Sequence, residues 1–246
     1  MRRSAVSRVS APNVVGLLQG SDPTLRQEYL VYSAHMDHVG VGHPDVTGDS
    51  IYNGADDDAS GTVAVVETAE AFACLRTRPR RSVIFLLVSG EERGLWGSEH
   101  FTSHGPVRAG QMVAALNVDM VGRNWKDTIV AIGKEHSDLG ATLARVNAAH
   151  PELGMTAVDD LWPQQRYYYR SDHYNFARQG VPILFFFNGE HADYHRPSDH
   201  ADKIDAEKES RIVKLIFLLG LDIANRAERP RWNPDSYRQI VEGTSR

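Results

Sequence analysis

The sequence has a single cysteine, Cys74, among its 246 residues. One thiol excludes an intramolecular disulfide and any metal site built on several thiolates. We expect Cys74 itself to be a buried, small side chain inside a helix, without a chemical role. Any bound metal must therefore be held by histidines and carboxylates, and the chain has 11 His and 32 Asp and Glu residues.

An excess of basic residues and a long apolar run are also missing. The 27 Lys and Arg residues are outnumbered by the acidic ones, so the formal net charge is −5. This balance disfavours binding to nucleic acid or to an anionic membrane surface. The longest apolar stretch, near 215–221, contains a glycine and is too short to span a membrane. The hydrophobic content of 41% is typical of a globular chain that is long enough to bury its own core.

Predicted strands alternate with predicted helices along the chain. Runs of apolar and β-branched residues predict strands at 13–18, 28–34, 82–88, 112–118, 128–132 and 181–187. Helical spacing of apolar residues predicts helices at 62–75, capped by Ser60, at 137–149 and at 207–227. The segment 39–53 is rich in Gly, Pro and Asp, and we expect a loop there. The alternation predicts an α/β domain around a mostly parallel sheet.

Metal-capable side chains follow four of the predicted strands. In chain order they are His35 and Asp37, Glu91 and Glu92, Asp119, and, a few residues after the last strand, His195. Ligands of an open parallel sheet bind outside the carboxyl ends of its strands. We therefore expect these scattered residues to converge in space. Each residue alone is equally compatible with a surface loop or a helix cap, and only the joint pattern indicates a site.

A run of three acids, Asp56, Asp57 and Asp58, precedes the predicted helix at 62–75. Consecutive carboxylates repel one another, and a bound cation is one way to hold them together. A solvated turn that caps the helix is the alternative for this segment alone.

Other catalytic motifs are missing. The pairs His100/His104 and His191/His195 have helical spacing but lack the Glu that a His-Glu-x-x-His zinc motif requires. The sequence also has no Gly-x-Ser-x-Gly elbow and no glycine-rich phosphate loop. Serine-hydrolase and nucleotide-binding functions are therefore unsupported.

Five segments together resemble peptidase family M28, the zinc aminopeptidases of the aminopeptidase S/Y type. They are SAHMDH at 33–38, NGADDDASG at 53–61, GEERGLWGS at 90–98, NVDMVG at 117–122 and YHRPSD at 194–199. The resemblance extends from about residue 13 to residue 224. It implies a three-layer α/β/α sandwich with a mixed, mostly parallel central sheet. It also implies a cis peptide bond between Asp57 and Asp58.

The resemblance implies two zinc ions bridged by one carboxylate. Carried over motif by motif, His35 and Asp119 would bind one zinc, Glu92 and His195 the other, and Asp57 would bridge them. Glu91 would be the general base, Asp37 the carboxylate that orients His35, and Tyr194 a hydrogen-bond donor to the developing oxyanion. The segment Ser171-Asp172-His173 resembles a further stretch near the family's substrate pocket, without an assigned role. Nitrogen and oxygen ligands suit a catalytic zinc with open positions.

The expected organisation is one catalytic domain at 13–228, a flexible lead-in at 1–12 and a polar tail at 229–246. Exported members of the family suggest a secreted or periplasmic protein, although residues 5–12 do not form the apolar core of a signal peptide.

The expected activity is removal of N-terminal residues from peptides. Three alternatives stay open at this point. A glutaminyl-cyclase-like acyltransferase would use one zinc on the same fold. A carboxypeptidase or amidohydrolase would need a cation for the substrate carboxylate, for which Arg123 and Arg170 are candidates. A binding domain without catalysis would not need the complete set of ligands and base.

Overall fold

A seven-stranded sheet forms the centre of the protein in the computed structural model, which describes residues 10–243. The strands lie in the order β1 (Val14–Leu18), β5 (Ser82–Val88), β2 (Tyr29–His35), β6 (Met112–Val118), β9 (Ile183–Phe186), β7 (Thr128–Ile132) and β8 (Thr156–Val158). The four strands β5, β2, β6 and β9 run parallel to one another, whereas β1 and β7 pair antiparallel with their neighbours β5 and β9. The expected mixed, mostly parallel sheet is confirmed.

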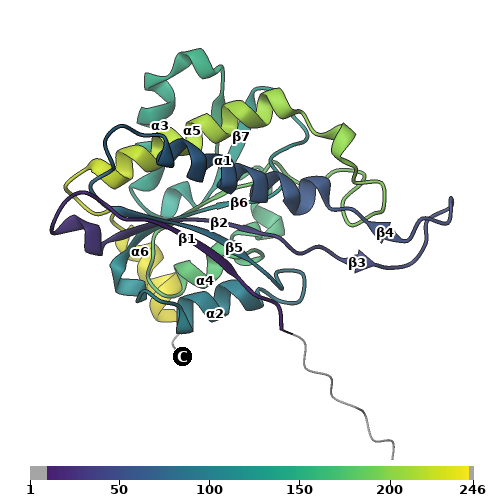
Figure 1. The fold of residues 1–246 in the computed structure, drawn as a ribbon, viewed down its shortest axis with the longest axis horizontal. Coiled ribbons are helices and arrows are strands. Elements are labelled where there is room, and N and C mark those ends of the chain that lie inside the picture. The colour runs from purple at the N-terminus through teal and green to yellow at the C-terminus, as the bar shows by residue number, and fades with distance from the viewer. Residues whose placement is uncertain (1–9, 244–246) are drawn as a thin grey trace, which may run out of the picture.

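Helices cover both faces of this sheet (Figure 1). Helices α1 (Gly61–Ala73), α3 (Leu139–Ala149) and α5 (Ala206–Asn225) lie on one face, and α2 (Trp96–His104), α4 (His173–Ala177) and α6 (Pro234–Tyr237) lie on the other. Each layer encloses its own apolar core, so the fold is the three-layer α/β/α sandwich that the resemblance implied.

The central strands are continuous apolar runs because both of their faces are buried. In β2, Leu30, Tyr32 and Ala34 pack under α1, α3 and α5, while Val31 points to the layer of α2 and α4. Helix α5 begins after Asp205, whose side chain accepts a hydrogen bond from the main-chain N of Lys208. Its apolar stripe, which includes Ile212 and Leu219, faces the sheet.

Three local expectations need correction. The segment 39–53 is not wholly irregular, because β3 (Gly40–Val41) and β4 (Ile51–Tyr52) pair as a short antiparallel hairpin at its two ends. Cys74 is exposed, since it follows the last residue of α1 at the surface. Ser60 does not cap α1, because its hydroxyl donates to the carbonyl of Asp56, and Asp58 accepts from the main-chain N of Gly61 instead.

The sequence patterns missed β8, α2 and α4, which are short or have a weak apolar stripe. The predicted lead-in at 1–12 lies mostly outside the described residues. In the predicted tail, the structure forms the short helix α6 and buries Ile240 in the apolar core on the side of α2 and α4. The domain boundary near residue 228 stays a prediction. Between residues 10 and 243, none of the helices has the length and apolar character needed to cross a membrane.

The topology gathers the chemistry at one edge of the sheet. His35 is the last residue of β2, Asp119 follows β6, and Glu91 and Glu92 lie shortly after β5. The loop after β9 leads to His195, and Asp57 lies in the turn before α1. Because the four parallel strands all point the same way, their carboxyl ends place these segments side by side.

Candidate metal centre

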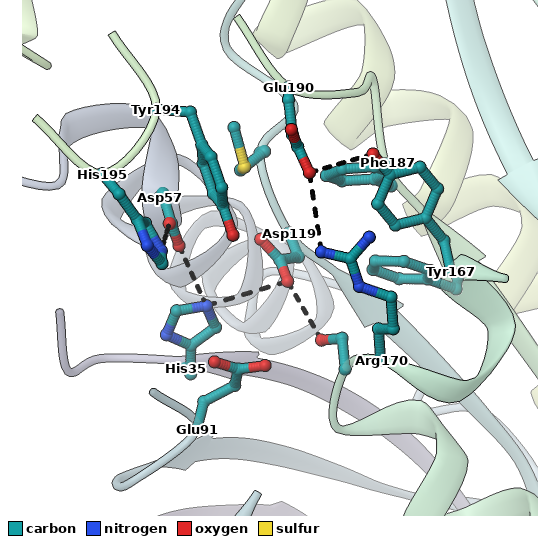
Figure 2. A pocket seen from close by; sticks show the side chains of 13 residues that line it. His35, Asp57, Glu91, Asp119, Tyr167, Arg170, Phe187, Glu190, Tyr194 and His195 are labelled. Atoms are coloured by element: carbon teal, nitrogen blue, oxygen red, sulfur yellow. Dashed lines mark hydrogen bonds and ion pairs between the residues drawn. The ribbon is translucent and has the colours of Figure 1, made fainter. Parts of the chain in front are cut away.

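Four predicted ligands surround the fifth, Asp57, and Figure 2 shows His35, Asp119 and His195 beside it. One carboxylate oxygen of Asp57, Oδ1, lies 3.3 Å from His35 Nε2, and the other, Oδ2, lies 3.0 Å from His195 Nε2. His35 Nε2 is also 3.7 Å from Asp119 Oδ2, and His195 Nε2 is 3.2 Å from Glu92 Oε2. Asp57 therefore stands between two separate pairs, each made of one histidine and one acid.

The charges of this cluster perturb one another strongly. Burial opposes ionisation of Asp57, but hydrogen bonds from His195 and His35 hold the pKa of its carboxyl well below the usual range. Asp57 and Glu92 together raise the pKa of His195 to about 10. Burial disfavours charge on His35, yet Asp58, Asp119 and Asp57 raise its pKa above the ordinary value. The acids thus favour positive charge within the cluster, which protonated imidazoles or a bound cation can supply.

A sixth side chain, His38, joins the group although it was not predicted as a site residue. Its Nδ1 lies 2.9 Å from Glu92 Oε1 and 3.7 Å from Asp57 Oδ2. The first contact lacks the alignment of a hydrogen bond, so His38 Nδ1 and Glu92 Oε1 are buried without a hydrogen-bond partner among residues 10–243. The signal was present in the sequence, because His38 ends the motif that contains His35 and Asp37.

These donors fit a metal. Four side chains, His38, Asp57, Glu92 and His195, offer ligand atoms that all lie within 4.8 Å of one another. His35 and Asp119 form a second such group with Asp58. A borderline cation such as zinc accepts imidazole and carboxylate ligands, and it would satisfy the unpartnered nitrogen and oxygen atoms.

Asp58 shapes the turn around this centre. Its carboxylate accepts main-chain hydrogen bonds from His35 (3.1 Å), Gly61 (2.9 Å) and Met120 (3.3 Å). It thereby ties β2, the start of α1 and the end of β6 to one point. The peptide bond between Asp57 and Asp58 is cis, which confirms the expectation.

Asp37 contacts His35 differently from the expected arrangement. The Nδ1 atom of His35 lies 2.9 Å from the main-chain carbonyl oxygen of Asp37, whereas the Asp37 carboxylate is 3.9 Å away. A carbonyl acceptor holds the proton on Nδ1 and leaves Nε2 free to face Asp57 and Asp119. The Asp37 carboxylate instead accepts a hydrogen bond from the main-chain N of Glu91, at 3.2 Å.

Glu91 and Tyr194 both line the cavity beside the cluster. Burial, reinforced by Asp119, Asp172 and Glu92, raises the pKa of the Glu91 carboxyl to about 9, even though the charge of His35 acts in the opposite direction. The ring of Tyr194 stacks on that of His195 at 4.0 Å, and its hydroxyl end points into the cavity near Asp119 (Figure 2). Neither side chain belongs to the two groups of clustered ligand atoms.

The segment at 171–173 contributes a buried chain of hydrogen bonds behind Asp119. Ser171 Oγ donates to Asp119 Oδ2 at 3.0 Å, and Asn117 Nδ2 donates to Ser171 Oγ at 3.3 Å. The chain ends at Ser33, whose hydroxyl donates to Asn117 Oδ1 at 2.6 Å. These contacts fix the orientation of Asp119 from β6, β2 and the start of α4.

The loop that carries Tyr194 and His195 is anchored by its own charged residues. His191 Nε2 lies 3.2 Å from Asp56 Oδ2, and Asp193 pairs with Arg123 at 3.0 Å. The positive φ of His195, 52°, turns its ring back toward Asp57. The sequence patterns did not single out these anchors, because each joins residues that are far apart in the chain.

The cavity extends from the ligand cluster to an aromatic wall. Its volume is about 380 Å³, part of it open to solvent. The residues that line it besides the ligands include Met120, Tyr167, Arg170, Phe185, Phe187 and Glu190. The aromatic runs at 167–169 and 185–187 therefore contribute to both the core and the cavity.

Known proteins are similar to this chain in sequence and in fold. A probable zinc metalloprotease from Pyricularia oryzae is 27% identical over 93% of this chain and 54% of the relative. A zinc aminopeptidase from Bacillus subtilis has the same fold, with a TM-score of 0.71 at 18% identity, covering 88% of this chain and 51% of that chain. A glutaminyl cyclase from Porphyromonas gingivalis also shares the fold, with a TM-score of 0.64 at 16% identity over 85% of this chain and 77% of that chain.

The chain spans little more than half the length of the curated relatives that it matches. Residues 13–219, most of the sequence, match peptidase family M28. That range includes every one of the clustered ligands described above. This chain belongs to peptidase family M28.

Proposed function

We propose that the protein is a di-zinc aminopeptidase that removes N-terminal residues from peptides. The observation that carries the proposal is the position of Asp57, whose two carboxylate oxygens face separate pairs of histidine and acid. Two neighbouring cations can share a single carboxylate that lies between two ligand pairs. The names of the relatives, a zinc metalloprotease and a zinc aminopeptidase, support zinc as the metal.

His35 and Asp119 would hold one zinc, Glu92 and His195 the other, and Asp57 would bridge them. His38 would lie beside Glu92 as a further nitrogen donor or as its hydrogen-bond partner. Bound zinc would polarise the scissile carbonyl and lower the pKa of a coordinated water toward neutrality.

The proton transfers fall to Glu91. Its carboxylate would accept the proton of the attacking water and deliver it to the leaving amine, which is the role of a general base that then acts as an acid. Burial keeps the pKa of the carboxyl high, at about 9, while no cation is present. Positive charge at the centre would lower that pKa and favour the ionised form that the role demands.

Tyr194 would stabilise the negative charge that develops on the substrate oxygen. Its pKa is raised, first by burial and then by the nearby Asp57 and Asp119, so the phenol keeps its proton and can donate it in a hydrogen bond. The hydroxyl points into the cavity beside the ligands, where a bound carbonyl would lie (Figure 2).

The two candidate cations for a carboxypeptidase are both engaged by acids. Arg123 pairs with Asp193 and lies 3.8 Å from Asp199, which anchors the loop after β9. Arg170 reaches the cavity, but its guanidinium lies 3.6 Å from the carboxylate of Glu190. A pocket with balanced charges offers little attraction to a substrate carboxylate, and the aminopeptidase proposal is therefore favoured.

A panel of chromogenic substrates tests the proposal. We expect the zinc-loaded protein to hydrolyse aminoacyl anilides that have a free amine, to lose this activity with a chelator, and to regain it with zinc. The same anilides with an acetylated amine should not be hydrolysed. Hydrolysis of the blocked compounds, or release of C-terminal residues from a peptide, would contradict an aminopeptidase. Cyclisation of N-terminal glutamine without hydrolysis would indicate the acyltransferase instead.

Zinc should stabilise the protein more strongly as the pH rises. In the metal-free protein the folded-state pKa is about 9 for Glu91 and about 10 for His195, against ordinary values of 4.5 and 6.5. Both folded-state values are raised, so the folded state binds these protons more tightly, and stability is lost as the pH rises from about 4.5 to 9 for Glu91 and from 6.5 to 10 for His195.

Bound zinc would supply the positive charge that these protons otherwise provide. The imidazole of His195 must also be deprotonated to bind zinc. The difference in melting temperature between zinc-loaded and chelator-treated protein should therefore widen steadily between pH 6.5 and pH 9. A difference that stays constant or narrows over this range, measured by thermal denaturation in matched buffers, would contradict the assigned protonation states.

A further inference from the structure

We infer that Arg170 and Glu190 form a specificity-determining pair that selects uncharged side chains at the first residue of the substrate. The inference rests on the proposed aminopeptidase function, because it concerns the same cavity. Arg170 follows the short helical turn Tyr167–Tyr169, and Glu190 lies in the loop after β9. Figure 2 shows both side chains on the far side of the cavity from His35 and His195.

The pair is held in place by Tyr167. The Arg170 guanidinium lies over the Tyr167 ring, 4.6 Å from its centroid, and the Tyr167 hydroxyl donates to Glu190 Oε1 at 3.0 Å. The same carboxylate oxygen is 3.6 Å from Arg170 Nη2. One buried aromatic residue thus fixes both charges at the end of the cavity, although their side chains are 46% and 41% exposed.

Apolar side chains line the same cavity as this pair and the metal ligands. Phe185, Phe187 and Met120 are buried and line the cavity. The first side chain of a peptide bound at the ligand cluster would cross this wall with its carbon atoms. Its tip would then reach the guanidinium of Arg170 and the carboxylate of Glu190.

The balance of charge decides which tips are accepted. A carboxylate tip would be attracted by Arg170 but repelled by Glu190, and an ammonium tip would meet the reverse. A charged tip of either sign would have to break the ion pair between Arg170 and Glu190 or lie next to the member with the same charge. It would also lose part of its own hydration. An apolar tip avoids this repulsion, and a carboxamide can accept from Arg170 and donate to Glu190 at once. Leucine-like and glutamine-like residues should therefore be favoured over glutamate and lysine.

Two conservative variants test the pair in opposite directions. Glu190→Gln removes the negative charge but keeps an oxygen that can accept from Tyr167, and Arg170→Met removes the positive charge but keeps an apolar stem over the ring. The readout is the ratio of kcat/KM for Glu-, Lys- and Gln-anilides to that for the Leu-anilide. We expect Glu190→Gln to raise the Glu/Leu ratio and Arg170→Met to raise the Lys/Leu ratio, each by about threefold to tenfold for partly exposed charges. The double variant should return both ratios toward those of the native protein.

Glu99→Gln is the matched control. Glu99 forms a similar exposed pair with Arg178, at 3.0 Å, between α2 and α4. Its loss should leave every ratio unchanged. Ratios that stay unchanged in Glu190→Gln and Arg170→Met, or that move in the same direction in both, would overturn the inference.

Equilibrium binding of free L-glutamine, L-glutamate and L-lysine to the zinc-loaded variants gives a second readout, which does not depend on hydrolysis. If no anilide is cleaved, the aminopeptidase proposal fails. The relative affinities for free glutamine, glutamate and lysine still test whether Arg170 and Glu190 select uncharged side chains. The same opposite shifts in affinity would support the pair, and identical affinities across all variants would overturn it.

Discussion

Replacement of Glu91 by glutamine should lower kcat by about 10²–10⁴-fold, the usual contribution of a general base. The amide has nearly the same shape as the carboxylate but cannot take up the proton. The zinc content should remain that of the native protein, because Glu91 is not part of either group of clustered ligand atoms. Its main chain should also stay in place, since the hydrogen bond from its N to Asp37 Oδ1 does not involve the side chain.

Two control variants separate this effect from general damage. Glu70→Gln changes an exposed glutamate of α1 and should alter neither activity nor zinc content. Glu92→Gln changes the adjacent residue and should lower zinc content as well as activity, because Glu92 faces His195 and His38. Near-native turnover in Glu91→Gln, or zinc loss equal to that in Glu92→Gln, would remove Glu91 from its proposed role.

The second large effect concerns the metal content. His195→Ala should lower the zinc content from about two ions per chain to about one, because only one of the two ligand pairs contains His195. Asp57→Asn should have the larger effect, since an amide carries no charge and offers one oxygen where the carboxylate offers two. We expect this variant to lose both ions on dialysis and to have no detectable activity. Elemental analysis of dialysed protein measures both changes.

His104→Ala provides the control for the metal analysis. His104 is an exposed histidine at the end of α2, and its loss should leave two zinc ions bound. Unchanged zinc content in His195→Ala would contradict the ligand assignment. A native protein that binds only one zinc, with Asp57→Asn retaining it, would contradict the bridging role of Asp57 and favour a single-metal enzyme.

The strands of the central sheet were predictable because their burial is local information. A strand buried on both faces is apolar at most positions, so β5 and β6 coincide with the predicted runs at 82–88 and 112–118. Short elements lack such a signal. Helix α4 has five residues, and its position follows from the packing of Phe176 and Ala177 beneath the sheet. The burial predicted for Cys74 was wrong for a related reason. Apolar periodicity does not indicate at which residue the end of a helix becomes exposed to solvent.

The candidate ligands were also predictable, for a topological reason. Parallel strands place their carboxyl ends at one edge of a sheet, so acids and histidines that follow several strands must converge. His35, Glu92, Asp119 and His195 come after strands of the sheet and follow this rule. Asp57 lies in the turn before α1, and it was assigned as a ligand through the family resemblance. The structure brings all five together. Residue type and order along the chain therefore indicated where such a centre would lie, and the family resemblance supplied the ligand set and the zinc ions.

The remaining features depend on contacts between residues far apart in the sequence. The chain from Ser33 through Asn117 and Ser171 to Asp119 joins β2, β6 and the segment before α4. Arg170 likewise meets Glu190 from a segment 20 residues away at one side of the cavity. The contact between Asp37 and His35 depends on loop geometry that no periodicity encodes. The same is true of the close approach of His38 to Glu92. The sequence specifies which chemical groups reach the edge of the sheet, because strand direction alone determines that. Only tertiary packing determines which of those groups touch, because hydrogen bonds and ion pairs require positions to within a few tenths of an ångström.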